Sequence, residues 1–504
     1  MKKAKNEDPN RGLTRREFIV GATGTAGSLA LAGCGDSASI AATAAGAAGL
    51  PAPKDAGFDH VVVVMMENRS FDHYLGWVPG ADGVQAGTTL KDSAGNSHSS
   101  YNLAPKFQNC ELADPDHSYL GGRTEINEGR MDGFLLPQPA GDTFPIGYYT
   151  AADLPFFKGC AEHWTICDRY FSGILAATTP NRFYMHAGQT DRATNTVAIA
   201  TIPTVWDRMQ QVGRSVAYYY TDVSYTSFWG DKYKSFSKKY DLQSFAADMA
   251  AGTLANLTFV DNVGNTLNEG GAISMDDHPY ADVRDGQSFL NQVYNALRKS
   301  PKWDRTLVII NYDEWGGFYD HVSPPFAPVT PEEFAATGND GRLGCRVPCI
   351  LIGPRAKRGH VEHMQFDPNS ILNMLAWRFG FAPLGARASS NNMALALDYS
   401  NPPNTSTPAF DVAPGPFGGV CIPTVLIAHQ LPVAVPVPPL PIAPIPLPVP
   451  VQLPSVPGFD VPLPGPPTPP AGAGTTGLLE SARRRDEHEL ELQALRDLGS
   501  RFGF

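Results

Sequence analysis

The sequence predicts an α/β protein with a mostly parallel sheet sandwiched by helices. Three short, continuously apolar runs, at residues 60–66, 306–311 and 347–352, have the pattern of strands buried on both faces. Helical patterns over residues 283–299 and 370–379 lie between and after them. Strands that alternate with helices form parallel sheets. The composition agrees, because 504 residues with 42% hydrophobic and 18% charged residues suffice for a large core and exclude a wholly disordered chain.

Residues 1–34 are expected to be an export signal and not part of the fold. Arg15 and Arg16 precede a Gly/Ala-rich apolar run, which is the pattern of a twin-arginine signal. A chance arginine pair before an apolar helix is the alternative. The run is too short and glycine-rich to span a membrane well. The segment 31–34 resembles a lipobox in which Cys34 would carry lipid, and a chance cysteine is the alternative.

Export brings expectations about partners and location. The twin-arginine machinery would be a partner, and the destination would be periplasmic, membrane-anchored or extracellular, with contact to the membrane surface through the Cys34 lipid. Residues 35–54 are small, polar or Pro-containing and are expected to form a flexible tether. In an oxidising destination, the remaining cysteines could form up to three disulfides of undetermined pairing. They are Cys110, Cys160, Cys167, Cys345, Cys349 and Cys421.

The C-terminal region differs from the expected catalytic domain at residues 55–430. Of the 45 prolines, 17 lie between Leu431 and Pro470. Residues 431–476 therefore predict an extended Pro-rich linker, which is either a spacer or docking arm or an unselected connection. Residues 477–504 predict a charged helix with a leucine-bearing face. That helix could dock on the body, pair with another chain, rest on anionic lipid or remain solvated.

Acidic and amide side chains directly follow two of the predicted strands. Glu67 and Asn68 come after the first, and Asp313 and Glu314 come after the second. Ligands of α/β sheets bind at the carboxyl ends of the strands. Adjacent carboxylates repel each other unless a cation lies near them, and oxygen ligands suit a hard cation. The four residues therefore predict a metal site, against the alternative of solvated loops or helix caps.

A third segment, residues 177–184, predicts a turn into a helix and offers a nucleophile. Pro180 suits the first turn of a helix. A hydroxyl of Thr178 or Thr179 would face free backbone N–H groups and the positive end of the helix dipole, which favour an alkoxide and a bound phosphate. The alternative is that one of these threonines simply caps the helix.

Four of the twelve histidines stand out, and each of these four has a carboxylate neighbour in the sequence. They are His117, His278, His321 and His363. A carboxylate orients an imidazole and raises its pKa, which suits a phosphate dianion and a leaving alkoxide. We expect His60, His98, His429 and His488 to be structural. The net charge of −11 argues against a nucleic-acid partner.

These motifs together resemble the bacterial phosphoesterase family that includes phospholipases C and a class of acid phosphatases. The resemblance covers roughly residues 58–381, in the family's order. Its motifs are Glu67–Gly76, Asp114–His117, Met131–Phe134, Cys167–Phe171, Thr178–Arg182, His278–Pro279, Asp313–His321 and Arg346–Pro348. Two positions depart from the family: Ala176-Ala177 stands where Gly-Pro is common, and Asp277 precedes His278 where Glu or His is usual.

The resemblance implies an alkaline-phosphatase-like fold and assigns roles to single residues. One divalent metal ion, with zinc, calcium and iron as candidates, would be held by Glu67, Asn68, Thr178, Asp313 and Glu314. Thr178 would be the nucleophile, since the family places its Ser or Thr two residues before Pro-Asn-Arg. His117, His278 and His321 would act on the phosphoryl oxygens or the leaving group. Asn181, Arg182 and His363 would contact the substrate.

The expected activity is hydrolysis of a phosphate ester through a phospho-Thr178 intermediate. Phospholipase C action on phospholipid head groups is the first hypothesis. The alternative is a phosphomonoesterase of the acid-phosphatase type. A third hypothesis is a non-catalytic surface lipoprotein that binds its ligand, against which the intact set of metal and nucleophile residues argues.

Overall fold

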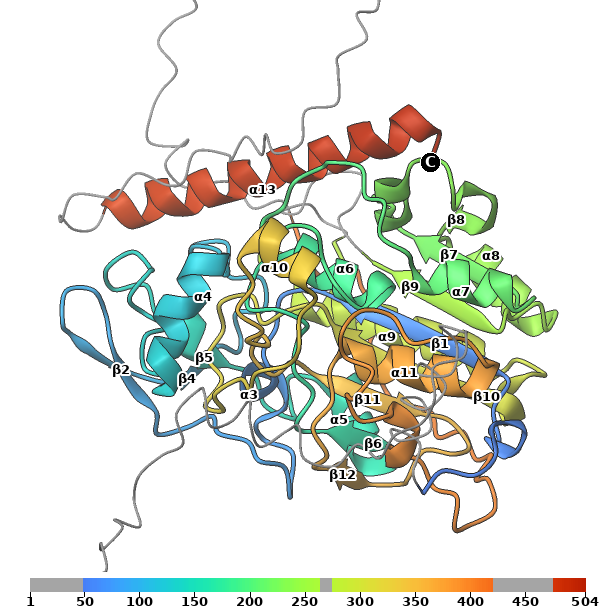
Figure 1. Ribbon diagram of the computed structural model, residues 1–504. Helices are drawn as coiled ribbons and strands as arrows, with labels where there is room; N and C mark the ends of the chain where they lie inside the picture. The colour runs from blue at the N-terminus through green and yellow to red at the C-terminus, as the bar shows by residue number, and fades with distance from the viewer. Residues whose placement is uncertain (1–48, 263–273, 420–474) are drawn as a thin grey trace, which may run out of the picture.

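An eight-stranded sheet forms the centre of the protein in the computed structural model, which describes residues 49–262, 274–419 and 475–504 (Figure 1). From one edge to the other, the strands are β12 (His360–Glu362), β6 (Thr165–Cys167), β11 (Cys349–Ile352), β10 (Thr306–Tyr312), β1 (His60–Met66), β9 (Leu257–Asp261), β7 (Val216–Tyr220) and β8 (Ser237–Lys239). Only β11 runs antiparallel to its neighbours in this sheet. The predicted α/β class with a mostly parallel sheet is therefore confirmed.

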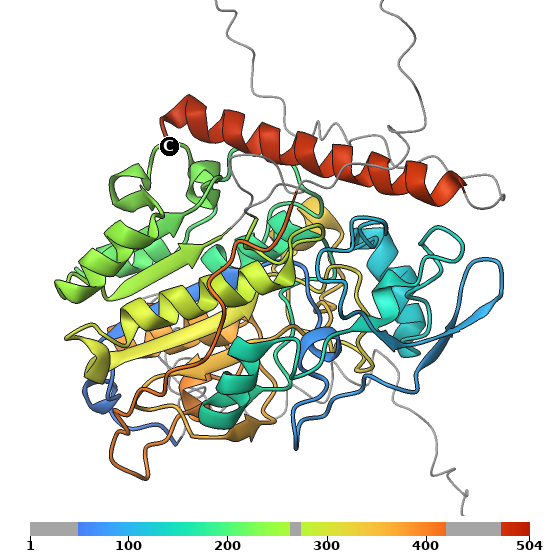
Figure 2. The ribbon, with the colours of Figure 1, turned by 180° about the vertical axis from the view of Figure 1, so that it is seen from behind.

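Helices cover both faces of the sheet, as Figures 1 and 2 show from opposite sides. One layer contains α5 (Pro155–His163), α8 (Leu242–Ala250) and α9 (Val283–Leu297), and the other contains α6 (Thr178–Ala187), α7 (Val205–Gln211) and α11 (Pro368–Phe379). Shorter elements extend the body: α3 (Phe71–Leu75), α4 (Tyr119–Ile126), α10 (Pro331–Thr337), β2 (Thr89–Lys91), β3 (Ser97–Ser99), β4 (Tyr101–Asn102) and β5 (Gly147–Tyr148).

The central strand β1 sets the position of the site. Its residues Val61–Val64 are completely buried, because helices cover both faces of the sheet here. The strand pairs in parallel with β10, with Met66 opposite Tyr312, and with β9, with Met65 opposite Asp261. Three parallel strands therefore end side by side, and the residues that follow them lie at one edge of the sheet.

The C-terminal helix α13 (Thr475–Phe502) packs on the body, which agrees with one of the four arrangements that the sequence left open. Leu492, Leu495 and Leu498 are buried, and the helix contacts the short helix η4 (Tyr225–Trp229). Arg496 forms an ion pair with Asp222 at 2.7 Å. The helix crosses the end of the sheet where β1 and β10 finish (Figure 1).

Several sequence predictions fall outside the described residues or differ from the structure. The export signal, most of the tether and the Pro-rich linker lie outside the described ranges. Cys160, Cys167, Cys345 and Cys349 are free and buried, which is inconsistent with three disulfides, and Cys110 is disulfide-bonded. No helix within residues 49–262, 274–419 and 475–504 combines the length and apolar character needed to cross a membrane.

Candidate active site

Two loops at the ends of β1 and β10 build the floor of the site. The backbone N–H of Asn68 donates to Asp313 Oδ1 at 3.2 Å, and the N–H of Arg69 donates to the carbonyl of Glu314 at 3.2 Å. Asn68 has a φ of 59°, a left-handed conformation that asparagine tolerates. A Cβ on Gly316 would lie 2.3 Å from the Asn68 carbonyl oxygen, so glycine is required for the loops to approach this closely.

Thr178 is the first residue of α6, and its hydroxyl faces these loops. Oγ1 donates to Glu67 Oε1 at 3.2 Å and lies 3.5 Å from Asn68 Oδ1. The N-cap residue is Ala177, which makes no side-chain capping bond, so Thr178 does not serve as the cap. Asn195 Oδ1 instead accepts the backbone N–H of Thr179 at 2.8 Å. The structure therefore brings the expected nucleophile together with two of the expected metal ligands.

Arg182, one turn after Thr178, lies beneath the site and is fully buried. Its guanidinium donates to Asp313 Oδ2 at 3.1 Å, hydrogen-bonds to Asp261 and lies 3.6 Å from Glu67 Oε2. Asn181 is also buried. Its side chain accepts the N–H of Ile174 and donates to the carbonyls of Ala176 and Ala177, which shapes the turn before the nucleophile.

The observed contacts of Asn181 and Arg182, which are expected to contact substrate, are with protein groups below the nucleophile. A buried guanidinium needs carboxylate partners, and here it takes three of them. Substrate contact by either residue stays a prediction.

His117 and His278 lie on the other side of the nucleophile pocket. His117 Nδ1 is 2.8 Å from the Pro115 carbonyl, which directs Nε2 toward Glu314 Oε1 at 3.8 Å. The two imidazole rings are edge to face, with centroids 6.2 Å apart, and His278 Nε2 lies 3.7 Å from Asp114 Oδ2. Both histidines therefore occupy positions from which they reach one ligand.

The two imidazoles have opposite shifts in pKa. Burial alone lowers the pKa of His117, but the carboxylates of Glu314 and Asp114 outweigh it and raise this pKa to about 9. Burial, together with the neighbouring ring of His488, lowers the pKa of His278 to about 3. One imidazole is thus set to carry a proton at neutral pH, and the other is set to remain neutral.

The charges of the pocket fit a divalent cation. The pocket contains four carboxylates and two groups that carry positive charge. The positive groups are the guanidinium of Arg182 and the imidazole of His117, and the carboxylates are those of Glu67, Asp261, Asp313 and Glu314. With all six groups ionised, two negative charges remain. Burial raises the pKa of Glu314 well above its usual value and that of Asp313 to about 6. Glu314 Oε1 is buried and has no hydrogen-bond partner among the described residues.

Two further groups in the described residues have the arrangement of metal ligands. One consists of Asp114, His117 and His278 beside the nucleophile, and the other of Asp72, Asp320 and His321. The second group already contains a cation, because Arg346 donates to Asp320 Oδ1 at 2.9 Å and to Asp72 Oδ1 at 3.1 Å. The first group is therefore the better metal candidate of the two.

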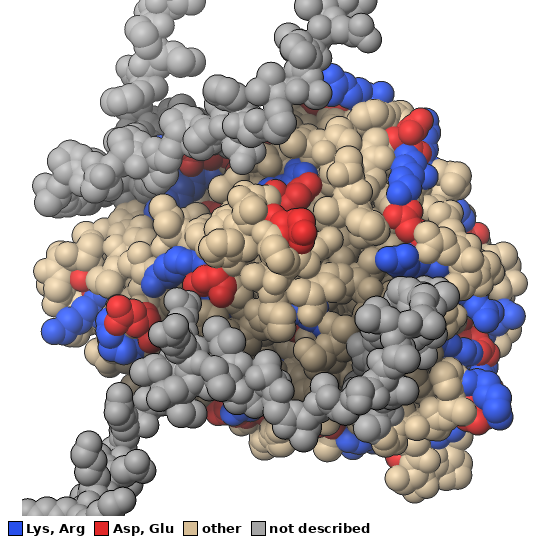
Figure 3. Space-filling view, in the orientation of Figure 1, with Lys and Arg blue, Asp and Glu red and all other residues tan. Residues whose placement is uncertain are grey.

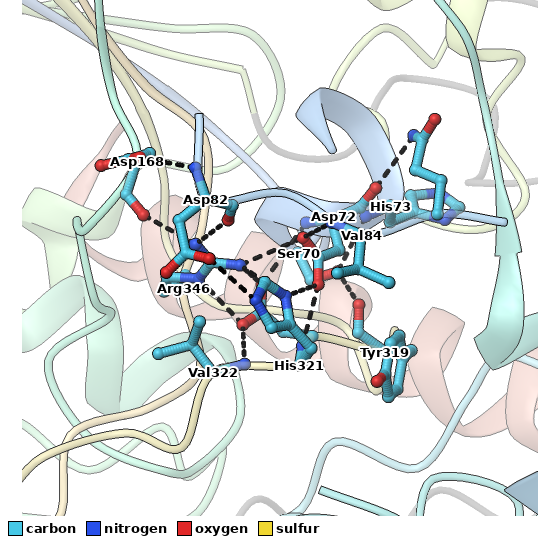
Figure 4. Close-up of polar contacts among 12 residues, drawn as sticks. Ser70, Asp72, His73, Asp82, Val84, Asp168, Tyr319, His321, Val322 and Arg346 are labelled. Carbon is cyan, nitrogen blue, oxygen red and sulfur yellow. Dashed lines mark hydrogen bonds and ion pairs between the residues drawn. The ribbon is translucent and has the colours of Figure 1, made fainter. Parts of the chain in front are cut away.

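His321 lies in a cluster around Arg346 and not at the expected place beside the nucleophile (Figure 4). His321 contacts Asp72 Oδ2 at 2.6 Å and Asp82 Oδ1 at 3.1 Å, and His363 contacts Asp168 Oδ2 at 2.8 Å. Within the described parts of the chain, no hydrogen bond or ion pair joins either histidine to Thr178. For His321, the reason is that this residue lies several positions beyond the end of β10, whereas Asp313 and Glu314 follow the strand directly. The predicted roles of His321 and His363 stay predictions.

The region that forms this site matches a known family. Residues 58–382 match the Phosphoesterase family, which is 64% of the chain. The chain belongs to the Phosphoesterase family. Phospholipase C B of Mycobacterium tuberculosis is 30% identical over 486 residues, with 81% of this chain and 89% of that protein covered. Non-specific phospholipase C1 of Arabidopsis thaliana is 32% identical over 353 residues, and the match spans 62% of this chain and 65% of the plant protein.

Solved structures show more distant likeness. Murine ectonucleotide pyrophosphatase/phosphodiesterase 5 superposes with a TM-score of 0.35 at 10% identity, over 67% of this chain and 100% of that chain.

Two residues of the site, Asp261 and Asn195, were not predicted from the sequence. Asp261 ends an apolar run at residues 257–261 that has a strand pattern, so a signal for it exists. Asn195 lies in a loop, and nothing in its local sequence indicates its contact with Thr179.

Replacing Arg346 is predicted to destabilise the phosphoesterase strongly. Arg346→Ala leaves the buried carboxylates of Asp72 and Asp320 without their cation, which costs on the order of 3–5 kcal/mol. Urea unfolding measures this loss. Arg130→Ala, at a side chain that is 55% exposed, is the control and should change the free energy of unfolding by less than about 0.5 kcal/mol. Equal stability of the two variants would contradict the prediction.

Asp277 gives a prediction about pH. Burial raises the pKa of its carboxyl to about 7, although a hydrogen bond from Tyr312 opposes this. Since the unfolded value is about 4, the folded state alone holds the proton between about pH 4 and 7, and stability is lost as pH rises through this range. Asp277→Asn should therefore gain stability relative to the wild type as pH rises from 5 to 8 in urea unfolding. A difference that stays constant with pH would refute the shift.

Proposed function

We propose that this protein is an exported, metal-dependent phosphoesterase that cleaves phospholipid head groups in the manner of a phospholipase C. The observation that carries the proposal is the contact of the Thr178 hydroxyl, at the start of α6, with Glu67 and Asn68. A hydroxyl at this point has a carboxylate to accept its proton and the positive end of the helix dipole to attract a phosphoryl oxygen.

In the proposed first step, Thr178 Oγ attacks the phosphorus in line with the leaving alcohol. The Oγ–P bond forms, the P–O bond to the alcohol breaks, and Glu67 Oε1 takes the proton of the threonine. His117, protonated at neutral pH, gives its proton to the leaving oxygen. The positive end of the α6 dipole stabilises the charge on the phosphoryl oxygens. Arg182 keeps the carboxylates in place from below.

In the second step, water attacks the phosphorus of the phosphothreonine and gives one proton to His117, the Oγ–P bond breaks, and Glu67 returns its proton to Thr178 Oγ. Glu67, Asn68, Thr178, Asp313 and Glu314 are the proposed ligands of one divalent metal ion, and their excess negative charge supports this. Such an ion would supply Lewis-acid stabilisation of charge on the phosphoryl group and the threonine oxygen. His278, neutral and next to Asp114, is proposed to contact a phosphoryl oxygen.

The names of the relatives support phospholipase C over acid phosphatase, since both mycobacterial and plant relatives are phospholipases C. The twin arginines and the lipobox pattern support export and attachment of lipid at Cys34. A phospholipid surface is then both the substrate source and the place of anchoring. Hydrolysis of p-nitrophenyl phosphate without hydrolysis of phosphatidylcholine would favour the acid-phosphatase alternative.

Thr178→Ala is predicted to lower kcat on phosphatidylcholine by at least on the order of 10³-fold, because the variant lacks the attacking oxygen. Thr179→Ala, at the neighbouring position, is the matched control and should retain most of the activity. Head-group release from phosphatidylcholine vesicles measures both. Loss of activity in Thr179→Ala with retention in Thr178→Ala would reassign the nucleophile, and an inactive wild type would favour the binding lipoprotein.

Removal of metal is predicted to abolish hydrolysis and to lower the Tm, because an ion that binds only the folded state stabilises it. Dialysis against a chelator, followed by metal analysis and thermal unfolding, tests this. Glu314→Gln should bind less metal than the wild type, whereas Glu332→Gln, on the exposed side of α10, should bind the same amount. Full activity in metal-free protein would exclude the proposed ligand role.

A further inference from the structure

The helix α13 lies over the nucleophile side of the active site. Its path above α4, α6 and α10 is visible from both sides of the molecule (Figures 1 and 2). The sequence indicated no role for His488 in this helix. In the structure, the His488 ring stacks on the ring of His278, with centroids 3.9 Å apart and an interplanar angle of 15°. A residue from the end of the chain therefore covers one face of a proposed phosphoryl-binding imidazole.

A second contact reaches the residue next to the nucleophile. Asn195 Nδ2 donates to Glu491 Oε2 at 3.0 Å, and Asn195 Oδ1 accepts the backbone N–H of Thr179 at 2.8 Å. Two hydrogen bonds thus connect α13 to the first turn of α6. Glu491 also interacts electrostatically with His117 and Asp114, so its carboxylate faces the same pocket.

The helix is attached on both sides of these contacts. Toward its start, Arg484 donates to the Asp114 carbonyl at 2.7 Å and to Gln138 Oε1 at 3.0 Å. Toward its end, Arg496 pairs with Asp222 beside a hollow of about 200 Å³, and the ring of Phe504 packs against that of Tyr220 with centroids 6.3 Å apart. The attachment therefore combines a few polar contacts with three buried leucines.

With α13 in this position, the reacting groups are closed off. Thr178 is 4% exposed and His278 is 1% exposed. A phosphorus atom carrying a glycerol backbone and a head group needs free space in line with Thr178 Oγ. Because His488 and Glu491 of α13 contact His278 and, through Asn195, the backbone of Thr179, movement of α13 would widen the access to Thr178.

We propose that α13 is a cover that closes the active site in water and is displaced by a phospholipid surface. The proposal rests on the proposed function, because the displacing surface is also the source of the substrate. Displacement of α13 exposes Leu492, Leu495 and Leu498. Exposure of these side chains to water is unfavourable, whereas their contact with lipid is favourable. The closed state is then preferred until the protein meets a membrane.

The surroundings of α13 suit a lipid partner. Leu490 on its outer side is 69% exposed, and Leu120 on the adjacent α4 is 74% exposed. Figure 3 shows mostly uncharged surface near the middle of this face, with a small group of acidic and basic side chains above it. Exposed leucines on a helix are typical of segments that contact lipid.

The first test uses the full chain and a water-soluble substrate, p-nitrophenyl phosphorylcholine. Arg496→Ala removes an attachment far from the reacting groups, so more molecules are open, and kcat/KM should rise at least threefold. Gln493→Ala, on the exposed side of the same helix, should leave the rate unchanged. Thermal unfolding checks that both variants are folded. A rate in Arg496→Ala that equals or falls below the wild type overturns the cover.

The second test measures hydrogen exchange in full-length Thr178→Ala with vesicles of phosphatidylcholine and phosphatidylglycerol. Vesicles should speed exchange in segments that contain Thr179, Asn195 and His278, since these lie under α13. Unchanged or slower exchange there overturns displacement by lipid. Failure of the proposed function is distinguishable, because it would appear as no hydrolysis of phosphatidylcholine by the wild type while Arg496→Ala still accelerates cleavage of the soluble ester.

Discussion

The arrangement of the site depends on one buried guanidinium. Arg182 contacts carboxylates that follow or end three adjacent strands: Asp261 of β9, Asp313 after β10 and Glu67 after β1. Because Arg182 stands one turn after Thr178 in α6, the same side chain that gathers the carboxylates also fixes the helix that presents the hydroxyl. A buried cation without these partners, or the partners without the cation, would be strongly unfavourable. The parallel register of β9, β1 and β10 is what brings the three carboxylates within its reach.

This constraint explains which parts could be predicted from sequence. The strands at residues 60–66 and 306–312 follow from their continuous apolar character, and the polar residues at their ends follow from the general position of ligands in α/β sheets. Glu67, Asn68, Asp313 and Glu314 could thus be placed together without a structure. Thr178 required the family resemblance, since a threonine at a helix start is most often a cap.

Contacts between distant segments could not be predicted in this way. Arg182 lies in a family motif, but its burial depends on Asp261, whose strand was not recognised. His321 has the same local pattern as His117, a histidine after an aspartate, yet it pairs with Asp72 and Asp82 near Arg346. His488 stacks on His278 across more than two hundred residues of chain. Local sequence carries no signal for such pairs, because tertiary packing alone brings them together.

A site that is closed in water is compatible with a lipid substrate. The pocket contains several buried carboxylates and a neutral imidazole, and excluding water from it strengthens every electrostatic interaction inside. A cover that opens only at a membrane keeps the hydroxyl of Thr178 from acting on soluble esters in the surrounding solution. The leucines that pack α13 on the body in the closed state are the same side chains that would contact a lipid surface in the open state.

The most direct test of the account is to capture the covalent intermediate. Wild-type protein mixed with phosphatidylcholine vesicles, quenched during turnover at neutral pH and digested, should show a phosphorylcholine group on Thr178 by mass spectrometry. Neutral conditions preserve adducts of histidine as well as those of threonine. Phosphorylcholine on Thr178, and none in Thr178→Ala, is the predicted result. Phosphorylcholine on His117 or His278, or turnover in Thr178→Ala, would contradict the account.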